Sequence, residues 1–175
     1  MDTILEVPYS SQYLDIDVKE HLLTACGMTT VYMVLRYYGV SDESLDKLVE
    51  RGVAEGGYSK SGWLHDYLIK VFEDHGIESN RRENMLDRDV AGIRASIKAG
   101  NPVVISMQRF SFDRRIFHMV VLVGYRENVK GELEGFFYHD PAGLFVEEVS
   151  NIFVSIPVFL QYWRRKAIFS SRNHH

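Results

Sequence analysis

Cys26 is the residue in this sequence best suited to do chemistry, and it is the single cysteine among 175 residues. It stands directly before Gly27 and an apolar, aromatic run that reaches Tyr38. The backbone N–H groups of a first helical turn have no partner within the helix, and the helix dipole adds partial positive charge there. A thiol at this position lies in a field that favours the thiolate, which is the nucleophilic form of cysteine.

An inert core role is the alternative interpretation of Cys26, because free cysteine is among the most buried residue types. A core cysteine is expected inside an apolar run. Cys26 instead precedes the run and neighbours a glycine, where a backbone can approach a ligand closely. Its position therefore favours the reactive role.

A thiolate nucleophile needs a base, and that base needs an acceptor that orients it. His118 opens a β-branched run that continues to Tyr125, and Asp140 ends a second run at 136–140. Antiparallel neighbours joined through a turn at 127–134 would place the start of one strand beside the end of the other. The pattern predicts that His118 and Asp140 are cross-strand partners.

Other interpretations of these residues stay open at the level of sequence. A histidine at a strand end is commonly a structural residue, and Asp140-Pro141 also fits an ordinary turn in which the carboxylate accepts from its own backbone. His139 is a rival base, but alternation along a strand places it on the opposite side from Asp140. The remaining internal histidines are predicted to be solvated: His21, His65 and His75.

The first half of the chain has helical periodicity. The segment beginning at Cys26 is apolar on almost every side, which predicts a buried central helix that Gly39 terminates. A short edge strand is expected at 4–9, ended by Pro8. Three further helices are expected, at 45–52, 62–75 and 87–99. The glycine-rich stretch 56–62 lacks a phosphate-binding ending and is interpreted as a hinge or a wall of a substrate groove.

The second half changes to strand periodicity. Strands are expected at 102–107, 117–125, 135–140 and 144–149, then a helix at 157–163 and a closing strand at 167–171. Helices followed by strands indicate an α+β fold, with a helical half led by the helix at Cys26 packed on an antiparallel sheet. The length suits one domain, 1–175.

Composition narrows the class of protein. A net charge of −4 argues against nucleic-acid binding, and the arginine pairs at 81–82, 114–115 and 164–165 are interpreted as solvated surface patches. One cysteine excludes an intramolecular disulfide, and no apolar run is long enough to span a membrane. We expect a soluble, cytoplasmic protein that needs neither a cofactor nor a metal.

Several separated segments together resemble the C39-like peptidases of the papain-like cysteine peptidase superfamily. These segments are 7–12, 26–39, 100–104, 118–125 and 139–141. The resemblance implies a papain-like fold with Cys26 as nucleophile, His118 as general base and acid, and Asp140 as the residue that orients the imidazole. It also implies Gln12 as an oxyanion-hole donor beside the Cys26 backbone N–H, with 15–22 looping out between them.

The activity implied is hydrolysis of a peptide or protein through an acyl-enzyme. Three alternatives remain. The fold could bind a peptide or leader segment without turnover, or transfer the acyl group to an amine instead of water. A zinc site built from Cys26, His118 and Asp140 ranks last, because zinc would occupy the nucleophile.

Overall fold

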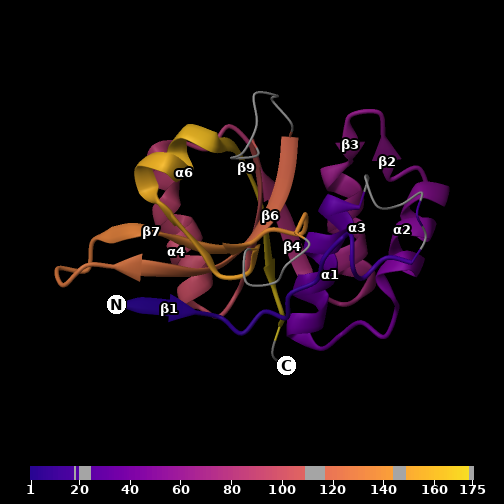
Figure 1. Ribbon diagram of the computed structural model, residues 1–175, viewed down its shortest axis with the longest axis horizontal. Helices are drawn as coiled ribbons and strands as arrows, with labels where there is room; N and C mark the ends of the chain where they lie inside the picture. The colour runs from indigo at the N-terminus through magenta and orange to yellow at the C-terminus, as the bar shows by residue number, and fades with distance from the viewer. Residues whose placement is uncertain (18, 20–24, 109–116, 144–148, 174–175) are drawn as a thin grey trace.

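The computed structural model describes residues 1–17, 19, 25–108, 117–143 and 149–173. Its helices gather at two sides of an antiparallel sheet (Figure 1). On one side lie α1 (Cys26–Tyr38), α2 (Leu45–Ala54) and α3 (His65–Asp74), together with the small hairpin of β2 (Tyr58–Ser59) and β3 (Gly62–Trp63). On the other side lie α4 (Val90–Lys98) and α6 (Ile156–Tyr162).

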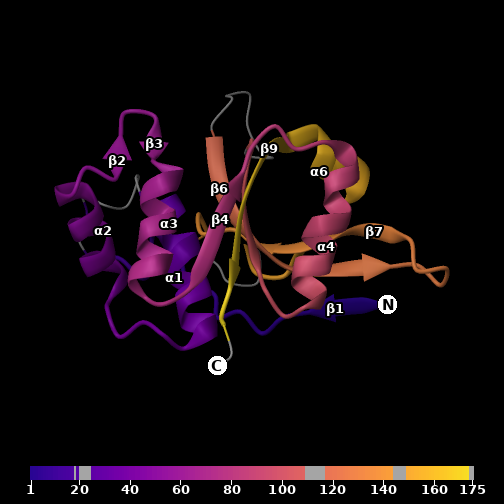
Figure 2. The ribbon, with the colours of Figure 1, turned by 180° about the vertical axis from the view of Figure 1, so that it is seen from behind.

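The sheet is ordered β4-β9-β5-β6-β7-β8, and every described pair in it is antiparallel. Its strands are β4 (Glu78–Arg82), β9 (Trp163–Ser171), β5 (Val103–Gln108), β6 (Phe117–Glu127), β7 (Leu133–His139) and β8 (Ile152–Ser155). The short β1 (Asp2–Ile4) pairs with the second half of β6, whose first half pairs with β5. Figure 2 shows β4 and β9 crossing the middle of the molecule from behind.

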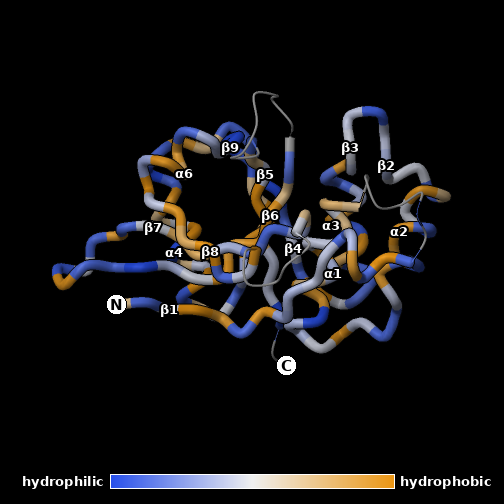
Figure 3. Tube along the Cα trace, in the orientation of Figure 1, coloured by the Kyte–Doolittle hydropathy of each residue, from blue (hydrophilic) through white to orange (hydrophobic). Residues whose placement is uncertain are grey.

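Alternation along the strands divides the core into two clusters. In β6, Val121 and Val123 pack with the helices α1 to α3, whereas Val120 and Leu122 pack with α4 and α6. Side chains of a strand point alternately to its two faces, so a strand buried on both sides reads as a continuous apolar run. Figure 3 shows such apolar stretches of β5 and β6 in the centre of the molecule.

The buried helix α1 begins at Cys26 and ends at Tyr38, as its apolar sequence predicts. Most of its residues are buried, and Gly39 takes the left-handed conformation (φ 67°) that terminates a helix. Only glycine adopts this conformation without a steric penalty. The α+β arrangement, with this helix leading the helical half against an antiparallel sheet, is confirmed.

The limits of several predicted elements are wrong. The N-terminal strand lies at Asp2–Ile4 instead of 4–9, because it pairs with β6 before Pro8 is reached. The third helix starts at His65, since Gly62 and Trp63 belong to the hairpin with β2. Strand β8 was not predicted. The strand expected at 144–149 falls almost entirely outside the described residues.

No helix among the described residues is long and apolar enough to cross a membrane.

Candidate active site

Cys26 is the first residue of α1, and its side chain is half-buried. The first hydrogen bond of the helix runs from the Thr29 N–H to the Ala25 carbonyl, at 2.8 Å. The N–H groups of Cys26, Gly27 and Met28 therefore lie in the first turn, whose amides have no acceptor four residues back in the helix. Ala25 stands at the N-cap without a side-chain cap, and no acidic residue lies in the first turn. The positive end of the dipole is thus left beside the thiol.

Gly27 lets this helix end approach the sheet. A Cβ at this position would lie 3.0 Å from both the Met119 sulfur and a Trp63 ring carbon, closer than ordinary van der Waals contact. Met119 follows His118 on β6, and Trp63 lies on β3. The glycine after the thiol therefore brings Cys26 close to the strand that presents His118.

His118 and Asp140 are brought together at one end of β6 and β7. His118 Nε2 lies 2.6 Å from Asp140 Oδ1, with both side chains largely buried. The direct partner of His139 in the register is Val121, so Asp140, one residue beyond the strand, reaches His118 diagonally. This differs slightly from the expected direct pairing, and the geometry allows it because diagonal neighbours lie within reach of long side chains.

The Asp140 carboxylate is also fixed by its own turn. Its Oδ1 accepts the Ala142 N–H at 2.8 Å, and the Asp140 backbone carbonyl accepts the Tyr9 hydroxyl at 2.8 Å. The turn interpretation and the pairing with His118 therefore hold at once. A carboxylate oxygen held by a backbone N–H is positioned to orient an imidazole.

The surroundings of His118 determine its charge. Burial alone lowers the pKa of His118, but hydrogen bonds to Asp140 and Cys26, and the charges of both, outweigh burial and raise the pKa to about 9. Because Nε2 is held by Asp140, Nδ1 is the ring nitrogen left for the Cys26 sulfur. The raised pKa keeps the His118 imidazole protonated at neutral pH, with the Asp140 carboxylate as its partner.

His139 has a different environment. Its Nδ1 accepts the Asn151 N–H at 3.0 Å, which leaves Nε2 to donate to the Val7 carbonyl at 2.8 Å. Burial lowers the pKa of His139, although the bonds to backbone groups oppose the shift. His139 is therefore a neutral histidine that ties the N-terminal segment to β7.

Gln12 lies against the turn that contains Asp140. Its backbone N–H donates to the Pro141 carbonyl at 2.8 Å, and its side chain is buried, with 3% exposed. The neighbouring Ser11 hydroxyl donates to the Gly143 carbonyl at 2.6 Å. The N-terminal segment is thus carried to the end of β7, beside the pair formed by His118 and Asp140. His21, which was predicted to be solvated, lies outside the described residues.

A small cavity of about 60 Å³ joins the thiol and the imidazole. Its walls come from both halves of the molecule: Cys26, Ser61, Gly62, Trp63 and His65 on the helical side, and Ser106, His118, Met119 and Arg164 on the sheet side. A thiol, an imidazole and additional hydrogen-bond donors therefore line one cavity. The interpretation of 56–62 as a groove wall agrees with this lining, which includes Ser61 and Gly62.

A family model described as Peptidase_C39 like family matches residues 4–167. The chain belongs to this family. Cys26, His118, Asp140 and Gln12 all lie within the residues that this C39-like family model matches.

Solved structures with the same fold agree with this assignment. A Bacillus anthracis protein described as a C39-like peptidase superposes with a TM-score of 0.71 at 18% identity, covering 100% of both chains. The peptidase domain of Streptococcus ComA, a bifunctional ABC transporter involved in quorum sensing, gives 0.62 at 18% identity over 86% of this chain and 93% of its own.

A third similar structure contains a peptide. It is a double glycine motif protease from an AMS/PCAT transporter in complex with a leader peptide, with a TM-score of 0.56 at 18% identity, covering 98% of this chain and 100% of that one. A search among curated proteins found no significant match. At these identities the structural likeness establishes the papain-like fold of the C39-like peptidases, and the family comes from the sequence model.

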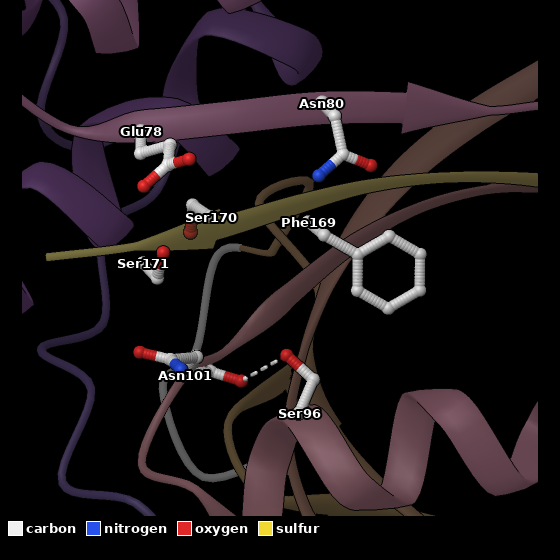
Figure 4. Close-up of a pocket in the computed structure, with 7 residues that line it drawn as sticks. All are labelled: Glu78, Asn80, Ser96, Asn101, Phe169, Ser170 and Ser171. Atoms are coloured by element: carbon white, nitrogen blue, oxygen red, sulfur yellow. Dashed lines mark hydrogen bonds between the residues drawn. The ribbon is translucent and has the colours of Figure 1, made fainter. Parts of the chain in front are cut away.

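A larger cavity of about 240 Å³ lies elsewhere in this C39-like protein (Figure 4). It is lined by Glu78 and Asn80 of β4, Ser96 and Asn101, and Phe169, Ser170 and Ser171 of β9. The Ser96 hydroxyl donates to the Asn101 carbonyl at 3.2 Å. None of these seven residues is a cysteine or a histidine, so size does not identify the reactive site. The thiol and the imidazole line the smaller cavity.

Two residues of the smaller cavity were misjudged from the sequence. Arg164 and His65 were interpreted as solvated, yet both line the cavity. Burial lowers the pKa of each, and the positive charge of Lys166 lowers the pKa of His65 further. The prediction for His75 is also wrong, since this ring is largely buried and its Nδ1 lies 2.7 Å from the Val71 carbonyl. Local polarity gave no signal for any of these placements.

The geometry does not favour a zinc site at Cys26. Asp140 Oδ1 occupies Nε2 of His118, which leaves Nδ1 as the ring nitrogen for the sulfur, so the ring would separate the carboxylate from the thiol. Within the described part of the chain, no group of three or more His, Cys, Asp and Glu side chains is arranged to hold a metal ion.

Proposed function

We propose that the chain is a cysteine peptidase that hydrolyses amide bonds through an acyl-enzyme at Cys26. The observation that supports this most directly is that Cys26 and His118 line one cavity while Asp140 holds the far side of the same imidazole at 2.6 Å. Membership of the C39-like family and the papain-like fold support the same reaction class. We further propose that 1–175 acts as one peptidase domain.

The first half of the reaction forms the acyl-enzyme. The Cys26 thiolate attacks the scissile carbonyl, forming an S–C bond and moving the carbonyl electron pair onto oxygen. The His118 imidazolium then gives its proton to the leaving nitrogen as the C–N bond breaks. Its raised pKa of about 9 keeps that proton on the ring at neutral pH.

The second half releases the product. Neutral His118 takes a proton from water, the hydroxide attacks the thioester, and the C–S bond breaks to restore the thiolate. Asp140 fixes the ring through Nε2, so the nitrogen toward Cys26 stays aligned in both steps. The state that begins each turnover is the ion pair of thiolate and imidazolium.

The oxyanion is proposed to be held by the Cys26 backbone N–H and the Gln12 side-chain amide. The Cys26 N–H lies at the uncapped start of α1, where the dipole favours negative charge. Gln12 is buried beside the turn of Asp140 through its backbone bond to Pro141. One missing donor of this kind typically costs about 10²–10³ in kcat.

The proposed substrate is a peptide or protein. The similar protease crystallised with a leader peptide supports peptide binding in this fold. A reduced thiol is required, so we place the reaction in a reducing compartment such as the cytoplasm.

The test is cleavage of a complex peptide library followed by mass spectrometry of new termini. We expect cleavage by the native chain and none by Cys26→Ala, whose fold should stay intact by circular dichroism because the thiol lies at a helix tip. Cys26→Ser is the matched control, since it keeps shape and polarity but is a far weaker nucleophile.

Turnover retained by Cys26→Ala would contradict the nucleophile assignment. Peptide retention without cleavage by the native chain would favour a binding module, and amide products in the presence of added amines would favour acyl transfer.

A further inference from the structure

Arg164 is a cation in the wall of the cavity that contains the proposed nucleophile. It lies on β9, and its Nη1 donates to the Ser106 hydroxyl of β5 at 3.1 Å. Ser106 accepts this bond through its oxygen, so its own hydroxyl hydrogen can be donated to an acceptor in the cavity. The reaction proposed above uses neither side chain.

A β-bulge directs Arg164 out of the regular ladder. Ser106 pairs with Lys166 and the next residue, Met107, pairs with Trp163, so Arg164 and Arg165 have no counterpart on β5. Bulges are over-represented beside active sites, where they redirect a side chain. The irregularity at this point of β9 thus places a guanidinium beside the thiol.

The bulge contains a strained residue as well. Arg165 has φ of 61°, a left-handed conformation that is unfavourable for a residue with a Cβ. Its guanidinium binds Asp87, donates to the Leu160 carbonyl and stacks over the Trp163 ring. These contacts hold the Arg165 side chain on the outside of the sheet. The adjacent arginines are therefore directed differently, one to the surface and one to the cavity.

The electrostatic surroundings of the cavity wall are positive. Among the described residues, Arg81, Lys166 and Arg164 each lower the pKa of His65, and Glu83 acts in the opposite direction. Glu83 is already shared, because it lies 3.7 Å from Arg81 and 3.9 Å from Lys166. A negatively charged group in the cavity would meet an excess of positive charge in a partly buried place.

The size of the cavity limits the group that fits. A buried water needs roughly 10–15 Å³ of such volume, so about 60 Å³ holds a group of a few heavy atoms. A carboxylate with one methylene is of this size, whereas an aromatic side chain is not. Carboxylate geometry also matches the planar fork of an arginine.

We propose that the cavity beside Cys26 is a carboxylate-binding subsite, in which Arg164 and Ser106 hold an acidic group of the substrate next to the scissile bond. Because this proposal concerns a preference among substrates, it rests on the proposed function. The carboxylate is either an Asp or Glu side chain or the terminal carboxylate of a peptide. Arg164 is then a specificity residue and takes no part in bond making.

Alkylation of Cys26 tests the subsite without any peptide substrate. Iodoacetate and iodoacetamide both form an S–CH₂ bond as iodide leaves, and they differ in that only iodoacetate carries a carboxylate. Since Cys26 is the single cysteine, mass spectrometry measures the rate of its alkylation directly. We expect Arg164→Gln to slow iodoacetate about tenfold, the scale of one charge-assisted hydrogen bond, and to change iodoacetamide less than twofold.

Arg165→Gln is the matched control, because it removes the same charge from the adjacent residue, and it should leave both rates unchanged. Arg164→Lys keeps the charge and should retain most of the iodoacetate rate, which separates loss of the subsite from misfolding. Equal slowing of both reagents by Arg164→Gln would overturn the proposal, since Arg164 would then act on the thiolate. No change with either reagent would overturn it too.

Matched peptides identify the source of the carboxylate. We expect the native chain to prefer Asp over Asn beside the scissile bond, or a free over an amidated carboxyl terminus, and Arg164→Gln to abolish whichever preference is found. Hydrolysis without either preference would overturn the subsite and leave the proposed function intact. Selective alkylation without hydrolysis of any peptide would contradict the proposed function and leave the subsite intact.

Discussion

His118 and His139 lie on neighbouring strands, are 6% and 2% exposed, and have pKa values shifted in opposite directions. Burial lowers the pKa of both rings. At His118 a carboxylate and a thiol reverse that effect, whereas at His139 a carbonyl and a backbone N–H do not. The comparison shows that the partners of a buried histidine, and not its burial, decide whether it carries charge.

The two rings also have different roles in the molecule. The His118 ring joins β6 to Asp140 and to the thiol of α1, so its charge belongs to the cavity. The His139 ring joins β7 to Val7 and Asn151, so it holds chain segments together. Removing each ring should therefore change a different property, activity for His118 and stability for His139.

The largest expected effect is on activity. His118→Gln should lower peptidase activity about a thousandfold or more, because glutamine cannot shuttle a proton, while His139→Gln should leave activity within a few fold. Both variants are compared on the same peptide at the same pH. Comparable activity losses in the two would remove the distinction between the rings.

The next effect concerns stability against pH. The folded pKa of His118, about 9, exceeds its ordinary 6.5, so the stabilisation it provides is complete below pH 6.5 and is lost as the pH rises through 9. The difference between these two pKa values corresponds to about 3 kcal/mol of the free energy of unfolding. Urea unfolding of the native chain and His118→Gln from pH 6 to 9.5 measures it. A constant difference between the two proteins over that range would contradict the ion pair.

Asp140→Asn should lower activity about a hundredfold. Asparagine keeps the shape and can still meet His118, but it removes the negative charge that raises the pKa of the ring. The pH-dependent loss of stability between 6.5 and 9 should shrink in the same variant. Activity unchanged by this substitution would show that Asp140 serves only its own turn with Ala142.

The smallest effect is on the stability of the His139 region. His139→Gln should cost about 1–2 kcal/mol, because one amide cannot satisfy both the Val7 carbonyl and the Asn151 N–H in the same geometry. The lowered pKa of His139 means that its stabilisation is present above pH 6.5 and is lost on acidification. Unfolding curves of the native chain and the variant at pH 5 and 7.5 measure the loss of stability and its dependence on pH. If the variant kept the same sensitivity to acid, the structural role of His139 would be contradicted.

Local patterns were sufficient to predict much of this site. Cys26 precedes a continuous apolar run, and such a run predicts a buried helix irrespective of the rest of the chain. His118 lies on β6 and Asp140 directly follows β7, the next strand, so a simple hairpin brings them together. These inferences needed contacts only between neighbouring elements.

Other features depend on contacts that are distant in sequence. Arg164 lines the cavity because of a bulge where β9 pairs with β5, some sixty residues away, and no local pattern marks a bulge. Strand β8 is four residues long and is stabilised by pairing with β7. His65 lines the cavity together with residues of the β2–β3 hairpin and of the sheet. Such placements follow from tertiary packing and not from propensity.

The central claim is that Cys26, His118 and Asp140 form one charged unit. NMR titration of the His118 imidazole tests it most directly, in the native chain, Cys26→Ala and Asp140→Asn. We predict titration near pH 9 in the native chain and a clearly lower pKa in each variant, because Cys26→Ala removes a hydrogen bond and a negative charge from the ring and Asp140→Asn removes a negative charge. Titration near 6.5 in all three proteins would contradict the claim.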